Sequence, residues 1–260
     1  MVTKIKHALS ITLTTECNYS CDSCLNTSLP DTSLQNIEDL VFFTKKANYY
    51  WSDIILTGGE PTIHPHCNQI VERLSELKTS NLGQVSVKSN GAKRIKPSIA
   101  SKIDDLALSL YGDWNRRKIN SALPYYKELG VKVRVADHSD DTKGGKWVVF
   151  PQTLPPYPPA PWVCDCDFYH MTQHRIFYCY GVEGYAPHID PKFLKDKMVT
   201  LQDNFMAPFI NDSCKMNDVC KICWSNQGVR KALKKEATWH FGERFKPRFP
   251  LGFFVDLDEL

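Results

Sequence analysis

Three cysteines near the start of the chain have a spacing suited to a metal centre. Cys17, Cys21 and Cys24 follow the pattern C-x3-C-x2-C directly after a short apolar run. Three thiolates can hold three corners of a cubane 4Fe-4S cluster and leave the fourth iron open, whereas a closed structural site normally takes four protein ligands. A zinc site with its fourth ligand elsewhere, or unrelated buried thiols, would also account for the triplet alone.

A glycine pair followed by a carboxylate forms the second motif. Gly58, Gly59, Glu60 and Pro61 end the next apolar run of the chain. Two glycines let the backbone come close to a ligand, and the carboxylate can receive an ammonium group. Alone, this segment would indicate only a turn. Its position one predicted strand after the cysteine triplet gives it a stronger meaning.

The elements that must position these motifs follow an alternating pattern. Short β-branched runs alternate with amphipathic segments up to about residue 150, which is typical of βα repeats around a parallel sheet. The predicted strands cover residues 9–14, 53–57, 84–89, 105–110, 132–136 and 147–150. The predicted helices cover 34–46, 66–77, 97–102 and 116–129, and Ser33 is the expected N-cap of the first. Six strands predict an α/β fold, a partial (β/α)6 TIM-like barrel with its site after the strands.

The composition narrows the class of protein. Thirty-two Lys and Arg against 29 Asp and Glu give a net charge of +3, too small for a nucleic-acid coat. The N-terminus has no apolar signal segment, and the uncharged stretch 147–164 carries too many prolines for a membrane-spanning helix. We therefore expect a cytoplasmic protein whose ten cysteines serve as metal ligands or catalytic groups rather than disulfides.

The prolines also predict a domain boundary. Residues 151–161 read as a stiff, extended linker between a barrel unit, 1–150, and a second unit, 162–260. The second unit contains a segment, between Cys166 and Cys179, with the character of a hairpin. A two-residue turn at Thr172 and Gln173 would place these two cysteines directly opposite each other.

Further cysteines of the second unit complete a candidate metal site. Cys220 and Cys223 form a C-x2-C pair at the start of a predicted helix, where backbone amides favour thiolates. Cys164 and Cys214 are additional candidates, and Cys164 is an alternative to Cys166. The spacing serves either an iron-sulfur cluster or a four-thiolate zinc ribbon.

The cysteine triplet followed by Gly-Gly-Glu-Pro closely resembles the radical S-adenosylmethionine (SAM) superfamily. The resemblance implies that SAM chelates the open iron and that the segment 58–61 holds its amino group. Lys88-Ser89-Asn90-Gly91 resembles the segment that contacts the SAM ribose, and Ser109 matches the serine that faces the SAM carboxylate. Asn90-Gly91 is also a good turn dipeptide, and Ser109 would equally satisfy backbone groups.

Two positions are less typical of that family. An aromatic residue usually precedes the third cysteine and packs near the adenine, but this chain has Ser23 there. Tyr19 or other apolar groups are the alternatives for this contact. Cys67 resembles the hydrogen-atom donor of some radical epimerases, although a small buried core thiol is the simpler interpretation.

The resemblance also implies an activity. Such enzymes cleave SAM reductively to a 5′-deoxyadenosyl radical, with electrons from a flavodoxin- or ferredoxin-like donor. The second unit resembles a twitch or SPASM-like extension, which implies an auxiliary 4Fe-4S cluster on Cys166, Cys179, Cys220 and Cys223. We expect hydrogen abstraction from a small molecule, anionic if the basic residues between 230 and 248 contact it. Modification of a peptide or protein, and a non-enzymatic metal- or nucleic-acid-binding module, are the alternatives.

Overall fold

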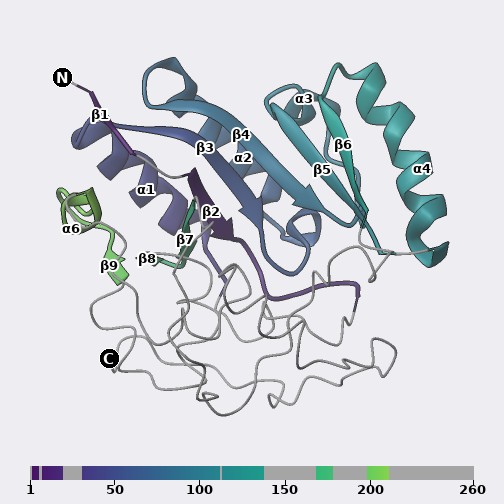
Figure 1. Ribbon diagram of the computed structural model, residues 1–260, viewed down its shortest axis with the longest axis horizontal. Coiled ribbons are helices and arrows are strands. Elements are labelled where there is room, and N and C mark those ends of the chain that lie inside the picture. The colour runs from purple at the N-terminus through teal and green to yellow at the C-terminus, as the bar shows by residue number, and fades with distance from the viewer. Residues whose placement is uncertain are drawn as a thin grey trace, which may run out of the picture.

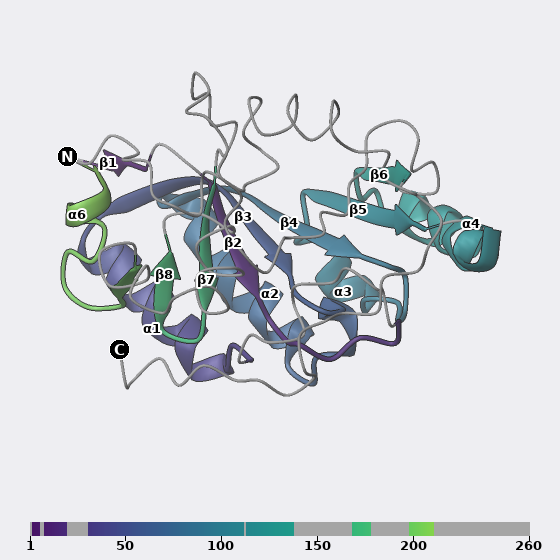
Figure 2. The ribbon, with the colours of Figure 1, turned by 60° about the horizontal axis from the view of Figure 1, so that its bottom comes forward.

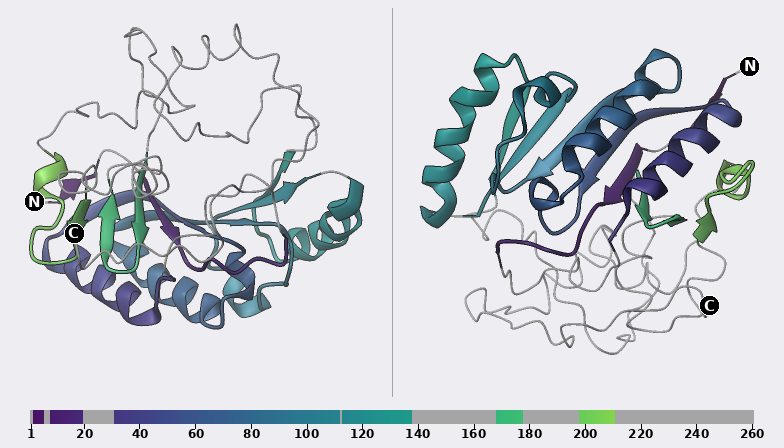
Figure 3. Two further views of the ribbon diagram at one scale, coloured as in Figure 1. Left: turned by 90° about the horizontal axis from the view of Figure 1, so that it is seen from below. Right: turned by 180° about the vertical axis from the view of Figure 1, so that it is seen from behind.

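The computed structural model describes residues 2–5, 8–19, 31–111, 113–137, 168–177 and 198–210. These residues form one sheet with helices against one of its faces (Figure 1, Figure 3). The strands are β1 Thr3–Lys4, β2 Ala8–Thr12, β3 Tyr49–Thr57, β4 Leu82–Ser89, β5 Asp105–Leu110, β6 Val133–Asp137, β7 Phe168–Thr172, β8 Arg175–Phe177 and β9 Met198–Thr200.

The sheet has the order β6-β5-β4-β3-β2-β7-β8-β9, with β1 paired to β3. All neighbours from β6 to β7 pair in parallel, whereas β8 and β9 pair in antiparallel fashion. The α/β prediction is therefore confirmed, and six parallel strands lie side by side in the described chain. The sixth is β7, which lies beside β2 (Figure 2). The strand predicted at 147–150 and the linker at 151–161 lie outside the described residues.

The helices agree closely with their sequence predictions. They are α1 Leu34–Lys46, α2 Cys67–Ser75, α3 Pro97–Ala100, α4 Asp113–Glu128 and α6 Ala207–Ile210, with 3-10 turns η2 Pro61–Ile63 and η3 Glu76–Thr79. Ser33 caps α1 in a capping box: its hydroxyl accepts from the Asn36 N–H at 3.2 Å, and the Asn36 side chain accepts from the Ser33 N–H at 2.9 Å.

The predicted turn of the β7–β8 hairpin is wrong by one residue. His170 faces Phe177 and Thr172 faces Arg175, so the turn consists of Gln173 and His174. Thr172 stays in the strand because its side chain is buried, and Gln173 takes the left-handed conformation, with φ of 50°, that a tight turn requires. In this register, positions 166 and 179 are not directly opposite each other, as the predicted turn required. The cysteines themselves, at 166 and 179, lie outside the described residues.

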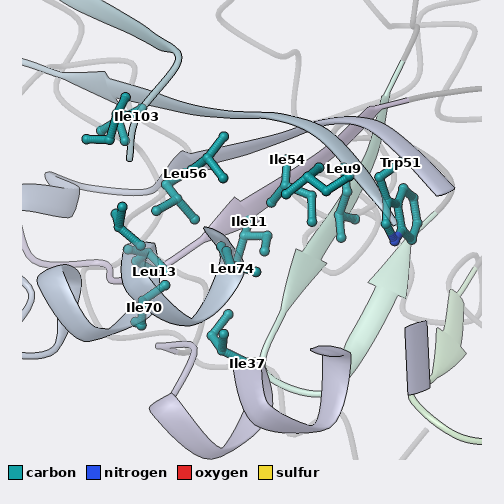
Figure 4. Close-up of a cluster of buried hydrophobic side chains, with 14 of the residues drawn as sticks. Leu9, Ile11, Leu13, Ile37, Trp51, Ile54, Leu56, Ile70, Leu74 and Ile103 are labelled. Carbon is teal, nitrogen blue, oxygen red and sulfur yellow. The ribbon is translucent and has the colours of Figure 1, made fainter. Parts of the chain in front are cut away.

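The two faces of the sheet differ in chemistry. Figure 4 shows Leu9, Ile11, Ile54 and Leu56 in the core with side chains of α1 and α2, such as Ile37 and Leu74. The residues that alternate with them are mostly polar, and they include Ser10, Asp53, Ser86, Lys88 and Asp105. Strands buried between two helical layers would instead be apolar throughout. One face thus builds the core, and the other presents polar groups.

Within the described residues, no helix is both long and apolar enough to cross a membrane.

Candidate cofactor site at the carboxyl ends of the strands

The candidate site lies where β2, β3 and β4 end. Cys17 follows β2, Glu60 follows β3, and Asn90 follows β4. Because these strands are parallel, their carboxyl ends meet at one edge of the sheet. Hydrogen bonds through Asn90 join all three residues into one network, whereas Cys21 and Cys24 lie outside the described residues.

The two glycines bring β3 against the segment that carries Cys17. The Gly59 N–H donates to the Thr14 carbonyl at 2.6 Å, and the Glu60 N–H donates to the Glu16 carbonyl at 2.8 Å. A Cβ on Gly59 would overlap the Glu16 carbonyl, and Gly58 has a φ of 133° that disfavours other residues. From the sequence, the glycines were expected to let the backbone come close to a ligand. In the structure they instead let the backbone of residues 14–16 pack closely, which fixes the start of the loop that carries Cys17.

The Glu60 carboxylate is buried, with 1% of the residue exposed, and it accepts four hydrogen bonds from protein groups. Its Oε1 accepts from the Thr62 N–H at 3.0 Å, the Thr62 hydroxyl at 2.5 Å and the Ser89 hydroxyl at 2.7 Å. Its Oε2 accepts from the Asn90 N–H at 2.6 Å. Glu60 therefore joins the end of β3 to the end of β4. Sequence reasoning missed Thr62. Glu60 is the N-cap of the turn that begins at Pro61, and an N-cap side chain typically accepts from the N–H two residues later, here that of Thr62.

The Asn90 side chain is directed at the cysteine loop. Its Nδ2 lies 2.9 Å from Asn18 Oδ1 and 3.5 Å from Cys17 Sγ. Its Oδ1 is buried and has no hydrogen-bond partner in the described part of the chain. A buried acceptor without a donor is costly, so this oxygen is suited to accept a hydrogen bond from a ligand.

Cys17 is half-buried, and two N–H groups converge on its sulfur. The Tyr19 N–H donates to Sγ at 3.4 Å, in addition to the Asn90 amide. Burial and the negative charge of Glu60 raise the pKa of Cys17, and the hydrogen bonds oppose this shift. A thiolate that accepts N–H bonds is the usual form of a metal ligand. The described part of the chain thus supplies one thiol suited to ligate an iron-sulfur cluster, with the acceptor Asn90 Oδ1 on a neighbouring residue.

The Tyr19 ring connects this loop to the end of β5. It packs edge to face against Tyr111, with ring centroids 6.2 Å apart, and Lys118 Nζ lies 5.7 Å from its centroid. Asn115, which sequence reasoning also missed, holds this region: Nδ2 donates to the Ser109 carbonyl and Oδ1 accepts from the Tyr111 N–H, both at 2.9 Å. Ser109 is buried and lies on the same sheet face as Lys88.

Cys67 lies apart from this network at the start of α2. It is 3% exposed and belongs to the hydrophobic core. Burial, with a smaller effect from the charge of Glu60, raises the pKa of its thiol to about 12. These facts favour the core thiol over the hydrogen-atom donor. The other candidate ligands, Cys164, Cys166, Cys179, Cys214, Cys220 and Cys223, lie outside the described residues.

Two proteins of known name are similar in sequence to about half of this chain. No family model matches the chain. The chain is 27% identical over 148 residues to the GTP 3′,8-cyclase of Aquifex aeolicus (strain VF5), which covers 49% of this chain and 46% of that protein. It is 28% identical over 158 residues to the molybdenum cofactor biosynthesis protein moc-5 of Caenorhabditis elegans, covering 52% of this chain and 26% of that one. The matches thus span less than half the length of either relative.

A solved structure shares the fold over most of the chain. The crystal structure of BtrN in complex with AdoMet and 2-DOIA matches with a TM-score of 0.53 and 14% identity, covering 89% of this chain and 91% of that one. The parallel part of the described sheet, from β6 to β7, accordingly matches a partial radical SAM barrel. The likeness of the fold and the two sequence relatives agree with the resemblance of the chain to the radical SAM superfamily.

Proposed function

We propose that this chain is a radical SAM enzyme whose cluster is held by Cys17, Cys21 and Cys24. The observation that carries the proposal is the network that joins Cys17 to Glu60 through Asn90 at the strand ends. When bound, the cluster and SAM supply reductive cleavage to a 5′-deoxyadenosyl radical, which abstracts hydrogen from the substrate. SAM is proposed to lie beside the cofactor-binding residues Gly58, Gly59, Glu60, Pro61, Ser89, Asn90 and Ser109.

The tasks of the protein residues follow from their contacts. The glycine pair holds the backbone that leads into Cys17, and Glu60 fixes the main chain at Asn90. The buried Asn90 Oδ1 offers an acceptor to the bound cofactor. A radical must be protected from water. Polar groups that already bond to one another, such as those of Glu60, Ser89 and Asn90, do not need water as a partner, so this site suits radical chemistry.

The proposed substrate is a small, polar, anionic molecule that undergoes dehydrogenation, epimerisation or rearrangement. Lys88 directly precedes Ser89 and lies on the polar face of the sheet, opposite the core. This face can receive a polar group next to the cofactor site. The name of one relative, GTP 3′,8-cyclase, also refers to a small anionic molecule.

A second 4Fe-4S cluster on Cys166, Cys179, Cys220 and Cys223 completes the proposal. It is supported by the number of these cysteines and by the C-x2-C spacing of Cys220 and Cys223. We also propose a flavodoxin- or ferredoxin-like electron donor, because the cleavage consumes one electron per SAM.

Anaerobic reconstitution of the full chain with iron and sulfide tests this proposal. The reduced protein should release 5′-deoxyadenosine from SAM, and the variant Cys17→Ala/Cys21→Ala/Cys24→Ala should release none. Cys67→Ala is the matched control and should keep this activity. Undiminished cleavage by the triple variant would refute the cluster assignment.

The same triple variant tests the auxiliary cluster. It should retain about four irons at the second site, and zinc or no metal in their place would refute the auxiliary cluster.

A further inference from the structure

The Asn90 side chain has an orientation that its neighbours determine. An amide nitrogen carries two hydrogens, and here one can go to Asn18 Oδ1 at 2.9 Å and the other to Cys17 Sγ at 3.5 Å. The flipped amide would instead place Oδ1 against the Asn18 oxygen and the Cys17 sulfur. Asn90 Oδ1 would then face two other acceptors, the Asn18 oxygen and the Cys17 thiolate. The N–H donor is therefore the group that points at Cys17.

The backbone of Asn90 is fixed by a separate contact. Its N–H donates to Glu60 Oε2 at 2.6 Å, and the adjacent Ser89 hydroxyl donates to Glu60 Oε1 at 2.7 Å. With the two bonds from Thr62, this carboxylate accepts four hydrogen bonds from protein donors, and the residue is 1% exposed. In this arrangement Glu60 has its effect on the cysteine loop by holding the residue that contacts it.

We infer that Asn90 donates a hydrogen bond to the Cys17 thiolate and thereby raises the reduction potential of the cluster, and that Glu60 is the positioning residue that holds Asn90 in place. The inference rests on the proposed function, because it needs a cluster on Cys17. Reduction adds negative charge to a cluster and its thiolates. An N–H dipole aimed at a ligand sulfur stabilises the reduced form more than the oxidised form, so its loss lowers the potential.

The Tyr19 N–H supplies a second donor to the same sulfur at 3.4 Å. It belongs to the backbone of the loop and remains when Asn90 is replaced. The Asn90 contribution is thus the one that mutation can remove, and the cluster is expected to stay bound without it.

The test is a redox titration of the reconstituted full chain, monitored by electron paramagnetic resonance. The cluster on Cys17 is identified by the change in its signal on addition of SAM, which separates it from a second cluster. Asn90→Ala should lower the midpoint potential, and Asn90→Asp should lower it further because it adds a negative charge. Iron content per chain is measured for every variant.

Asn81→Ala is the matched control. Asn81 and Asn90 are equally buried, each 4% exposed, and the Asn81 amide also donates to a buried acceptor, the Tyr49 carbonyl at 2.8 Å. Its loss should lower the thermal stability and leave the potential unchanged. An equal shift in Asn81→Ala and Asn90→Ala would overturn the inference, because general destabilisation would then explain both.

A double-mutant cycle tests the role of Glu60. Glu60→Asp keeps the negative charge but moves the carboxylate away from the Asn90 N–H, so it should lower the potential. Adding it to Asn90→Ala should produce no further decrease, because the Asn90 side chain that Glu60 positions is already absent. Fully additive shifts would contradict the positioning role. A normal iron content with an unchanged potential in both Asn90 variants would overturn the inference alone. A wild-type chain without a cluster would instead overturn the proposed function.

Discussion

Cys17 and Cys67 show how two environments give the same side chain different chemistry. Burial raises the pKa of both thiols, and the charge of Glu60 adds to the shift at each. At Cys17, N–H groups of Tyr19 and Asn90 oppose this effect, and the sulfur is only half-buried. Cys67 lies in the core, where its pKa reaches about 12. The pKa of both thiols is thus raised, but only the sulfur of Cys17 already has N–H donors that a metal-bound thiolate would accept.

The two environments differ because Cys17 follows the end of a strand, whereas Cys67 is the first residue of a helix. Cys17 lies in a loop beyond the end of β2, where the backbone N–H of Tyr19 donates to the Cys17 sulfur. Cys67 begins α2, and its own N–H already donates to the His64 carbonyl at 3.1 Å. A strand end at the sheet edge therefore offers donors to a sulfur, whereas a helix start packed into the core offers apolar contacts.

The largest effect is expected from a substitution at Gly59, which disturbs the loop of Cys17 and leaves the surroundings of Cys67 unchanged. Gly59→Ala would place a methyl group against the Glu16 carbonyl, so we expect unfolding to become easier by about 3 kcal/mol or more. The iron content after reconstitution should fall as well. Gly130→Ala is the control: its Cβ meets nothing within 4 Å, and only its φ of 72° is strained, which costs about 1–2 kcal/mol. Normal iron content in Gly59→Ala would contradict the role of the glycine.

The second prediction concerns Glu60, whose negative charge raises the pKa of both thiols. Glu60→Gln replaces one of the two carboxylate oxygens, which accept from Ser89 and Asn90, with an NH2 group, so SAM should bind more weakly by about 1.5–3 kcal/mol. Equilibrium binding of SAM to the reconstituted protein measures this change. Glu72→Gln is a suitable control, since Glu72 pairs with Lys102 away from the strand ends. An unchanged dissociation constant in Glu60→Gln would count against a SAM site at this edge.

The third prediction sharpens the contrast through pH. The folded pKa of Cys67 is about 12 against an ordinary value of 9.0, so the unfolded chain loses this proton first as pH rises. Its contribution to stability is therefore complete below about pH 9 and is lost between about pH 9 and 12. Between about pH 8 and 10.5, the wild type should lose about 1–2 kcal/mol more unfolding free energy than Cys67→Ala. Denaturant titrations at both values measure it, and parallel losses in the two proteins would mean that Cys67 ionises normally.

The smallest expected effect lies outside both regions. Ser33→Ala removes the capping bond of α1 and should cost about 1 kcal/mol of stability. Thermal unfolding measures the loss, while the rate of SAM cleavage should stay unchanged. A loss of cleavage would show that the helix-covered face and the cofactor edge are not independent.

Much of the frame could be predicted because it depends on local chemistry. The helix Leu34–Lys46 and the strand Asp105–Leu110 have the predicted bounds, since an N-cap, an apolar period and a buried run mark them in the sequence. The cysteine triplet and the Gly-Gly-Glu-Pro segment likewise indicated the family, because residue type and spacing are properties of the chain itself.

Other features depended on which strands become neighbours, and only the tertiary structure decided them. The sixth parallel strand is β7 beside β2, although these strands lie far apart in the sequence. The same pairing of distant segments turned the glycine pair toward the Thr14–Glu16 backbone, placed Thr62 and Ser89 on the Glu60 carboxylate, and aimed Asn90 at Cys17. The sequence by itself determined which chemical groups are present and which strands they follow. Their partners were decided by packing across strands, because hydrogen bonds between side chains depend on spatial distance and not on sequence separation.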